Sequence, residues 1–198
     1  MAPDTSVLDP VAPARPVRVE HRTGHVPAAL LAAAIIALAS AALASFALDR
    51  AFVAVLLAGP LVVLSSIDIK RGIIPNRIVG PATAVVLVAQ LALFPERASH
   101  WLLAPLVAAA LLASPALFGR SWLGIGDVKL ALLIGVGLGW GVFGALVVAS
   151  LCMFPVALLV LARGGVAARK ATLPFGPFMS IGAIVVLFAP HVTGLPGS

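Results

Sequence analysis

Two aspartates are the strongest candidates for chemistry in this chain of 198 residues. Asp68 lies in the segment SSIDIKR at 65–71, and Asp127 lies in GIGDVKL at 124–130. Two carboxyl groups that come close enough to share a proton behave as one acid and one base. Such a pair can activate a water and protonate a carbonyl oxygen, so it could hydrolyse a peptide bond without a metal or an organic cofactor.

Each aspartate also has a structural interpretation. Asp127 precedes an apolar run, where it could cap a helix and accept backbone N–H groups. Asp68 follows an apolar run, and it could form an ion pair with Lys70, Arg71 or Arg77 in a solvated loop. The five other acids lie in the N-terminal tail or in short loops, and the four histidines are too scattered to form a metal cluster.

The composition indicates which elements must position the two acids. Hydrophobic residues make up 62% of the chain and charged residues only 10%. A soluble globule of this size could not bury so much apolar surface. The net charge is +6, but the basic residues stand in short clusters between long apolar runs, which favours orientation in a membrane over binding to nucleic acid.

Seven apolar runs are long enough to form helices, at 26–48, 51–67, 78–94, 101–118, 128–140, 141–162 and 175–190. Joined into one helix, the fifth and sixth runs would reach about 52 Å, which overshoots a hydrocarbon core of about 30 Å. A break near Gly139-Trp140-Gly141 is therefore expected. The predicted fold class is all-α, a polytopic membrane helical bundle with about seven transmembrane helices.

The basic residues predict the orientation of this bundle, because they collect in cytoplasmic segments. With the N-terminus inside and the C-terminus outside, both aspartates lie on the inner side and only Arg50 and Arg97 fall outside. The other 11 of the 13 basic residues are cytoplasmic: Arg15, Arg18, Arg22, Lys70, Arg71, Arg77, Arg120, Lys129, Arg163, Arg169 and Lys170.

Three motifs resemble those of the type IV prepilin peptidases. Residues 124–130 contain GxGD and the GDxKL form of this family, and Asp68 opens a D-(x6)-PN segment that ends at Pro75-Asn76. Residues 174–178, PFGPF, are similar to an element near the family's C-terminus. The likeness is greatest to the short members that serve Flp-type or Tad pili.

The chain divides into three regions. Its composition predicts a disordered basic cytoplasmic tail at 1–25 and an extra N-terminal transmembrane span at 26–48, and the resemblance covers a six-helix prepilin-peptidase-like domain at 51–190. The catalytic pair would be Asp68 and Asp127, with no cofactor and no metal. The residues expected to shape the site or bind substrate are Gly124, Gly126, Lys129, Lys70, Pro75, Asn76, Pro174, Phe175, Gly176 and Pro177.

The two lysines of this set need a separate interpretation. Lys70 and Lys129 each stand two residues after an aspartate, a spacing that does not face a helical neighbour. We expect them to hold the membrane interface or to meet lipid phosphate. A role in biasing the charge of the aspartates stays open.

The implied activity is that of an intramembrane aspartic endopeptidase. It would cut the leader of type IV or Flp-type prepilins or pseudopilins after a glycine, at the cytoplasmic face of a bacterial inner membrane. The other partners implied are the lipid bilayer and pilus-assembly components, with no nucleic acid. Bifunctional relatives also methylate the new N-terminus and carry an insert with paired CxxC motifs, whereas this chain has one cysteine, Cys152. Peptidase activity without N-methylation is therefore expected.

Two other functions fit a small polytopic protein with membrane-edge acids. One is a proton- or cation-coupled transporter, although neither aspartate lies at mid-membrane. The other is a non-catalytic pilus-assembly protein that keeps the fold.

Overall fold

The computed structural model describes residues 27–117, 124–164 and 174–189. The predicted basic tail and the residues Arg120, Arg169 and Lys170 lie outside these ranges. Within them the chain forms seven α-helices, one short 3-10 turn and no strand. The helices are α1 (Ala28–Ser45), α2 (Leu48–Arg71), α3 (Asn76–Leu93), α4 (Ala98–Leu117), α5 (Ile125–Leu138), α6 (Gly141–Gly164) and α7 (Gly176–Leu187), with the turn η1 (Pro95–Arg97) before α4.

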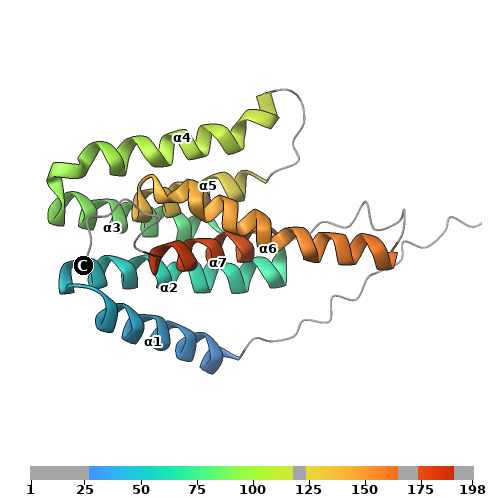
Figure 1. The fold of residues 1–198 in the computed structure, drawn as a ribbon, viewed down its shortest axis with the longest axis horizontal. Helices are drawn as coiled ribbons and strands as arrows, with labels where there is room; N and C mark the ends of the chain where they lie inside the picture. Colours follow the sequence, from blue (N-terminus) through green and yellow to red (C-terminus); the bar gives the residue numbers. More distant parts are fainter. Residues whose placement is uncertain (1–26, 118–123, 165–173, 190–198) are drawn as a thin grey trace, which may run out of the picture.

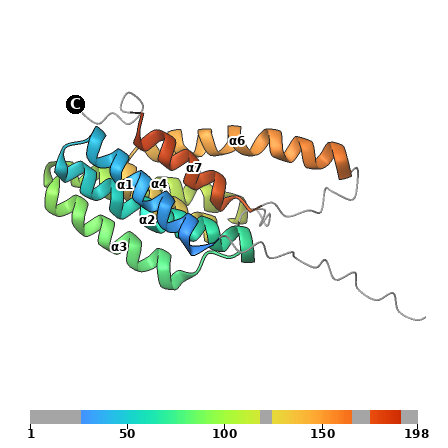
Figure 2. The same ribbon diagram turned by 90° about the horizontal axis from the view of Figure 1, so that it is seen from below.

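Successive helices run in opposite directions and pack side by side (Figure 1). The starts of α3, α5 and α7 therefore lie at the same end of the bundle as the end of α2 (Figures 1 and 2). We call this the aspartate end, because Asp68 and Asp127 both belong to it. Helix α1 lies against α2 at the side of the bundle (Figure 2).

Helix α5 is the central helix, and it contacts α2, α3, α4, α6 and α7. Most of its residues from Leu130 to Leu138 are buried. Two of its glycines allow close packing, since a Cβ at Gly135 would lie 2.6 Å from the Cα of Pro105 in α4, and one at Gly137 would overlap Leu57 of α2. The core thus forms around the helix that carries Asp127 near its start.

Several helices begin or end at a glycine or a proline. Helix α2 ends where Gly72 adopts a left-handed conformation with φ of 62°, and Pro75 precedes α3. The predicted break between the fifth and sixth runs is confirmed, because α5 ends at Leu138 and α6 begins at Gly141. Gly139, between them, has a positive φ of 56°.

Five of the helices described here are long and apolar enough to cross a membrane: α1, α2, α3, the segment Pro95–Ser114 that includes most of α4, and α6. Helices α5 and α7, with 14 and 12 residues, are shorter than the about 20 residues that a full crossing needs. The structure confirms an all-α polytopic membrane bundle. The predicted number of about seven helices agrees with it, but two of the seven are short.

Candidate active site

Asp68 lies inside α2, in its last turn, and the prediction that it stands in a loop after the helix was wrong. Helix α2 continues past the apolar run to Arg71, and the N–H of Gly72 donates to the Asp68 carbonyl at 2.7 Å. The Asp68 residue is only 6% exposed. A solvated ion pair with a neighbouring basic residue is therefore also excluded as its role, and its burial needs another partner.

That partner is the backbone of Gly176, 108 positions later in the chain. The Gly176 N–H donates to Oδ2 of Asp68 at 3.1 Å. Gly176 is the first residue of α7, and a Cβ there would lie 2.6 Å from the same oxygen. Only glycine lets the backbone come this close, so the PFGPF element supplies an amide to the first aspartate.

Asp127 is the third residue of α5 and is half-buried. Asp127 precedes the apolar stretch of α5, and α5 is not one of the five candidate spans. Burial and, to a smaller extent, the negative charge of Asp68 raise the pKa of Asp127, and a hydrogen bond with the backbone of Gly124 lowers it; together they bring this pKa to about 6. The effect of the Gly124 backbone is what a helix cap would produce, and the charge of Asp68 also acts on Asp127.

The motif around Asp68 also contacts the motif around Asp127. A Cβ on Gly126 would lie 3.2 Å from Cβ of Ile74, so the α2–α3 connection packs tightly against the start of α5. Lys129 donates from Nζ to Oδ1 of Asn76 at 2.6 Å, which joins α5 to α3. The three sequence motifs therefore meet at one end of the bundle.

The other expected site residues are placed as follows. Pro75 is half-buried and sets the extended backbone before α3. Phe175 precedes α7 in a helical conformation and packs against the core, with half-buried Pro174 and Pro177 on either side of the Phe175-Gly176 pair. Lys70 is half-buried in the last turn of α2 and forms no ion pair with the residues that the structure describes.

Lys129 makes a contact within the protein that was not predicted for it. Its ammonium group donates a hydrogen bond to Asn76, which lies 53 positions earlier in the sequence. Sequence reasoning also missed Ile74 as a site residue, although its place between Asp68 and Pro75 in the first motif was a signal.

Taken together, the described residues form a site with two acids, one of which is held by an amide. No group of three or more metal-ligating side chains occurs among the residues that the structure describes. An acid that keeps its proton to about pH 6 beside a buried carboxylate is suited to proton transfer between a water and a carbonyl group.

Residues 55–162 match the family model described as the type IV leader peptidase family. The chain belongs to this family. The match includes both aspartates, and it ends before the PFGPF element and α7. No curated protein and no solved structure matches the chain. Family membership establishes a multi-pass membrane peptidase of type IV leader sequences in general terms, which acts on prepilins within a lipid membrane.

Proposed function

We propose that this leader peptidase is an aspartic endopeptidase whose catalytic residues are Asp68 and Asp127. The observation that carries the proposal is that Asp68, 59 positions before Asp127 in the sequence, lies near enough for its charge to raise the pKa of Asp127. Two acids with unrelated roles on separate helices would have no reason to lie so near each other. The contacts between the three motifs at one end of the bundle support the proposal as well.

The two carboxyl groups have different surroundings, which suggests different roles. Asp68 accepts the amide N–H of Gly176, a bond that favours a charged carboxylate. Asp68 then takes a proton from water, and the oxygen of that water forms a bond to the carbonyl carbon of the scissile peptide. Asp127 donates its proton to the carbonyl oxygen. When the intermediate collapses, the C–N bond breaks, Asp68 passes the proton that it took from water to the leaving amine, and Asp127 regains its proton as the carbonyl reforms.

The arrangement of the charges supports the side from which the substrate would approach. Basic residues of the described helices gather at the aspartate end, as expected for the cytoplasmic side of an inner membrane, with the N-terminus inside and the C-terminus outside. The leader of a Flp-type prepilin or pseudopilin would reach this end from the cytoplasm and be cut after a glycine. The chain carries one cysteine, which favours cleavage without N-methylation.

The peptidase domain extends beyond the matched residues in this proposal, from 51 to 190. Helix α7 belongs to it because its first residue, Gly176, holds Asp68. Helix α1, in the region 26–48, is an additional span, and most of its residues are exposed.

The decisive experiment measures cleavage of a prepilin with a short basic leader that ends in glycine and is followed by an apolar helix. Asp68→Asn and Asp127→Asn should each reduce the rate by at least about 1,000-fold, because either change removes one of the two proton-transfer groups. The substrate is incubated with membranes that contain each variant, and its products are identified by mass spectrometry.

The matched control is Asp49→Asn, which removes an exposed carboxylate at the opposite end of α2. This variant should cleave at the wild-type rate. Cleavage that survives in either Asp68→Asn or Asp127→Asn, with equal amounts of folded protein, would rule out a two-aspartate mechanism.

A further inference from the structure

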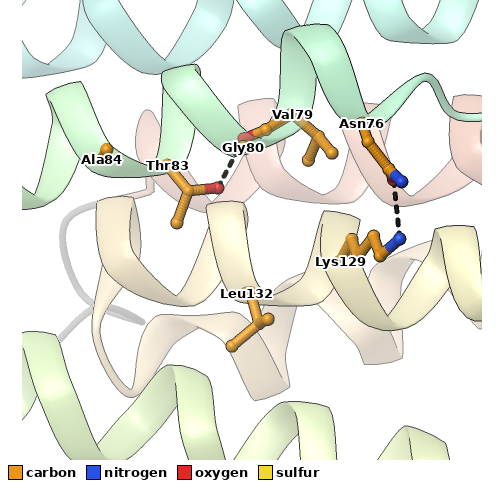
Figure 3. Close-up of a pocket in the computed structure, with 7 residues that line it drawn as sticks. All are labelled: Asn76, Val79, Gly80, Thr83, Ala84, Lys129 and Leu132. Carbon is orange, nitrogen blue, oxygen red and sulfur yellow. Dashed lines mark hydrogen bonds between the residues drawn. The ribbon is translucent and has the colours of Figure 1, made fainter.

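A groove lies between α3 and α5 on a different face of α5 from Asp127. Asp127 and Lys129 are two positions apart, so their side chains leave α5 about 200° apart. The groove has a volume of about 390 Å³, within the range of small-ligand sites. Its lining residues, shown in Figure 3, are Asn76, Val79, Gly80, Thr83, Ala84, Lys129 and Leu132.

One end of the groove is polar and presents hydrogen-bond donors. The Lys129 ammonium donates to Oδ1 of Asn76, and this bond occupies the acceptor of the amide (Figure 3). The remaining N–H groups of Lys129 and the NH₂ group of Asn76 have no partner among the described residues. A ligand at this end must therefore supply acceptors, and the charge of Lys129 favours an anion.

The rest of the groove is apolar. Gly80 is exposed, and a Cβ placed on it would meet nothing within 4 Å. The hydroxyl of Thr83 donates to the Val79 carbonyl of its own helix at 2.7 Å, so its donor is satisfied. From Asn76 to Ala84 the groove follows α3 for about 12 Å along a helix long enough to span a membrane.

We propose that this groove binds one anionic phospholipid. The phosphate accepts hydrogen bonds from Lys129 and Asn76, and one acyl chain lies over Gly80 and Ala84. The position of the donors at the start of α3, with apolar residues following along the span, matches the order of headgroup and chain in a bilayer leaflet. The nearby charged residue on α3 is Arg77, which is exposed and carries a positive charge, as Lys129 does.

A segment of the peptide substrate fits the groove less well. Because Lys129 and Leu132 leave α5 on a face away from Asp127, a helix seated here would not present its peptide bond to the two aspartates.

The test is native mass spectrometry of the full chain in detergent, titrated with dioleoylphosphatidylglycerol or with dioleoylphosphatidylcholine. The wild-type protein should prefer the anionic lipid. Lys129→Gln, which keeps a donor for Asn76 but removes the charge, should weaken binding of the anionic lipid by about fivefold and abolish the preference. Gly80→Leu, which fills the apolar part, should weaken both lipids by about tenfold.

The controls are Gly59→Leu and Arg97→Gln. Gly59 faces open space on α2, and Arg97 is a cation at the opposite end of the bundle. Both variants should bind as the wild type does, and the unfolding temperature of every variant shows that it is folded. An unchanged preference in Lys129→Gln, or unchanged binding in Gly80→Leu, would overturn the proposal. If Gly80→Leu weakens binding of a prepilin helix and of neither lipid, the groove is a substrate site instead.

Discussion

Two buried polar side chains, Asp68 and Gln90, stand on neighbouring helices at opposite ends of the bundle. Both are almost fully enclosed, with 6% and 3% exposure. Both also bind the backbone of another helix: Asp68 accepts from the N–H of Gly176, whereas Gln90 donates to the carbonyls of Val136 and Gly137 at 3.4 and 2.9 Å. They differ in charge, and therefore in how each acts on the groups around it.

Gln90 is neutral, and its amide binds two of the last carbonyls of α5, which the helix itself leaves without partners. Nearby, buried Trp101 donates to the carbonyl of Phe94 and packs against Gly139. This end of α5 is closed by neutral contacts. Asp68 instead lies near the other end of α5, where its negative charge raises the pKa of half-buried Asp127. The comparison teaches that the two ends of α5 differ in kind: neutral hydrogen bonds close one end, whereas at the other the charge of one acid acts on a second acid.

Gly176→Ala should have the largest effect on cleavage in this comparison, because it disturbs the aspartate end and leaves the Gln90 end unchanged. The new Cβ would lie 2.6 Å from Oδ2 of Asp68, so the carboxylate or the start of α7 must move. A displacement of about 1 Å at a catalytic group can reduce the rate by about 100-fold. We expect that loss in kcat of prepilin cleavage, with the helical content by circular dichroism retained.

Gly59→Ala is the control for this change, since the position lies on the same helix as Asp68 and a Cβ there meets nothing within 4 Å. It should cleave as the wild type does. If Gly176→Ala keeps half of the wild-type rate or more, the amide of Gly176 has no part in positioning Asp68.

Gln90→Leu should show the opposite pattern. It removes both donors to the α5 carbonyls and leaves them buried, which costs about 1–3 kcal/mol. The free energy of unfolding in detergent, followed by circular dichroism, should fall by that amount while the folded fraction keeps its cleavage rate. In Thr83→Val, the loss should stay below about 0.5 kcal/mol, since the Thr83 hydroxyl bonds only within α3. A Gln90→Leu protein that loses its rate but no stability would contradict the assignment of the two ends.

The helices and their order could be predicted from the sequence, because long apolar runs separated by glycine, proline and charge have few other solutions in a membrane. The need for a break followed from the combined length of two runs, and the glycines at 139 and 141 indicated its place. The end of α2 was placed too early, since the run of apolar residues stops at Ile67 while the helix continues to Arg71. A helix that is partly covered by others can carry a carboxylate on its buried face, so the charge of Asp68 was a poor guide to the helix end.

The contacts within the site could be predicted less well. Motifs indicated that residues 68–76, 124–130 and 174–178 belong together, but not which atoms meet. The bond of Gly176 to Asp68 joins residues 108 positions apart, and that of Lys129 to Asn76 joins residues 53 positions apart; both depend on how α2, α3, α5 and α7 pack. Gln90 was missed altogether. The signal for it was an amide within the apolar run 78–94, where a polar group needs a partner.

The smallest expected effect tests the charge that links the two acids. The pKa of Asp127 is about 6 in the folded chain, against 3.8 as its ordinary value. The folded state therefore holds this proton more tightly than the unfolded state does, and the stability it provides is complete below about pH 4 and lost as the pH rises through about 6. Asp127→Asn does not titrate, so it should become more stable than the wild type over this interval. Because Asp127 is partly exposed, solvent screening limits the gain to about 1 kcal/mol at pH 7.

The measurement is the unfolding temperature of both proteins in detergent at pH 4 and pH 7, repeated with Asp68→Asn in each. Desolvation of Asp127 persists without Asp68, whereas the repulsion between the two charges does not. The stabilisation by Asp127→Asn at pH 7 should therefore be smaller in the Asp68→Asn background than in the wild type, and at pH 4 it should be near zero in both. An equal gain in the two backgrounds would mean that the carboxyl groups do not interact, and the aspartate end would then resemble the Gln90 end, which is held without an interaction between charges.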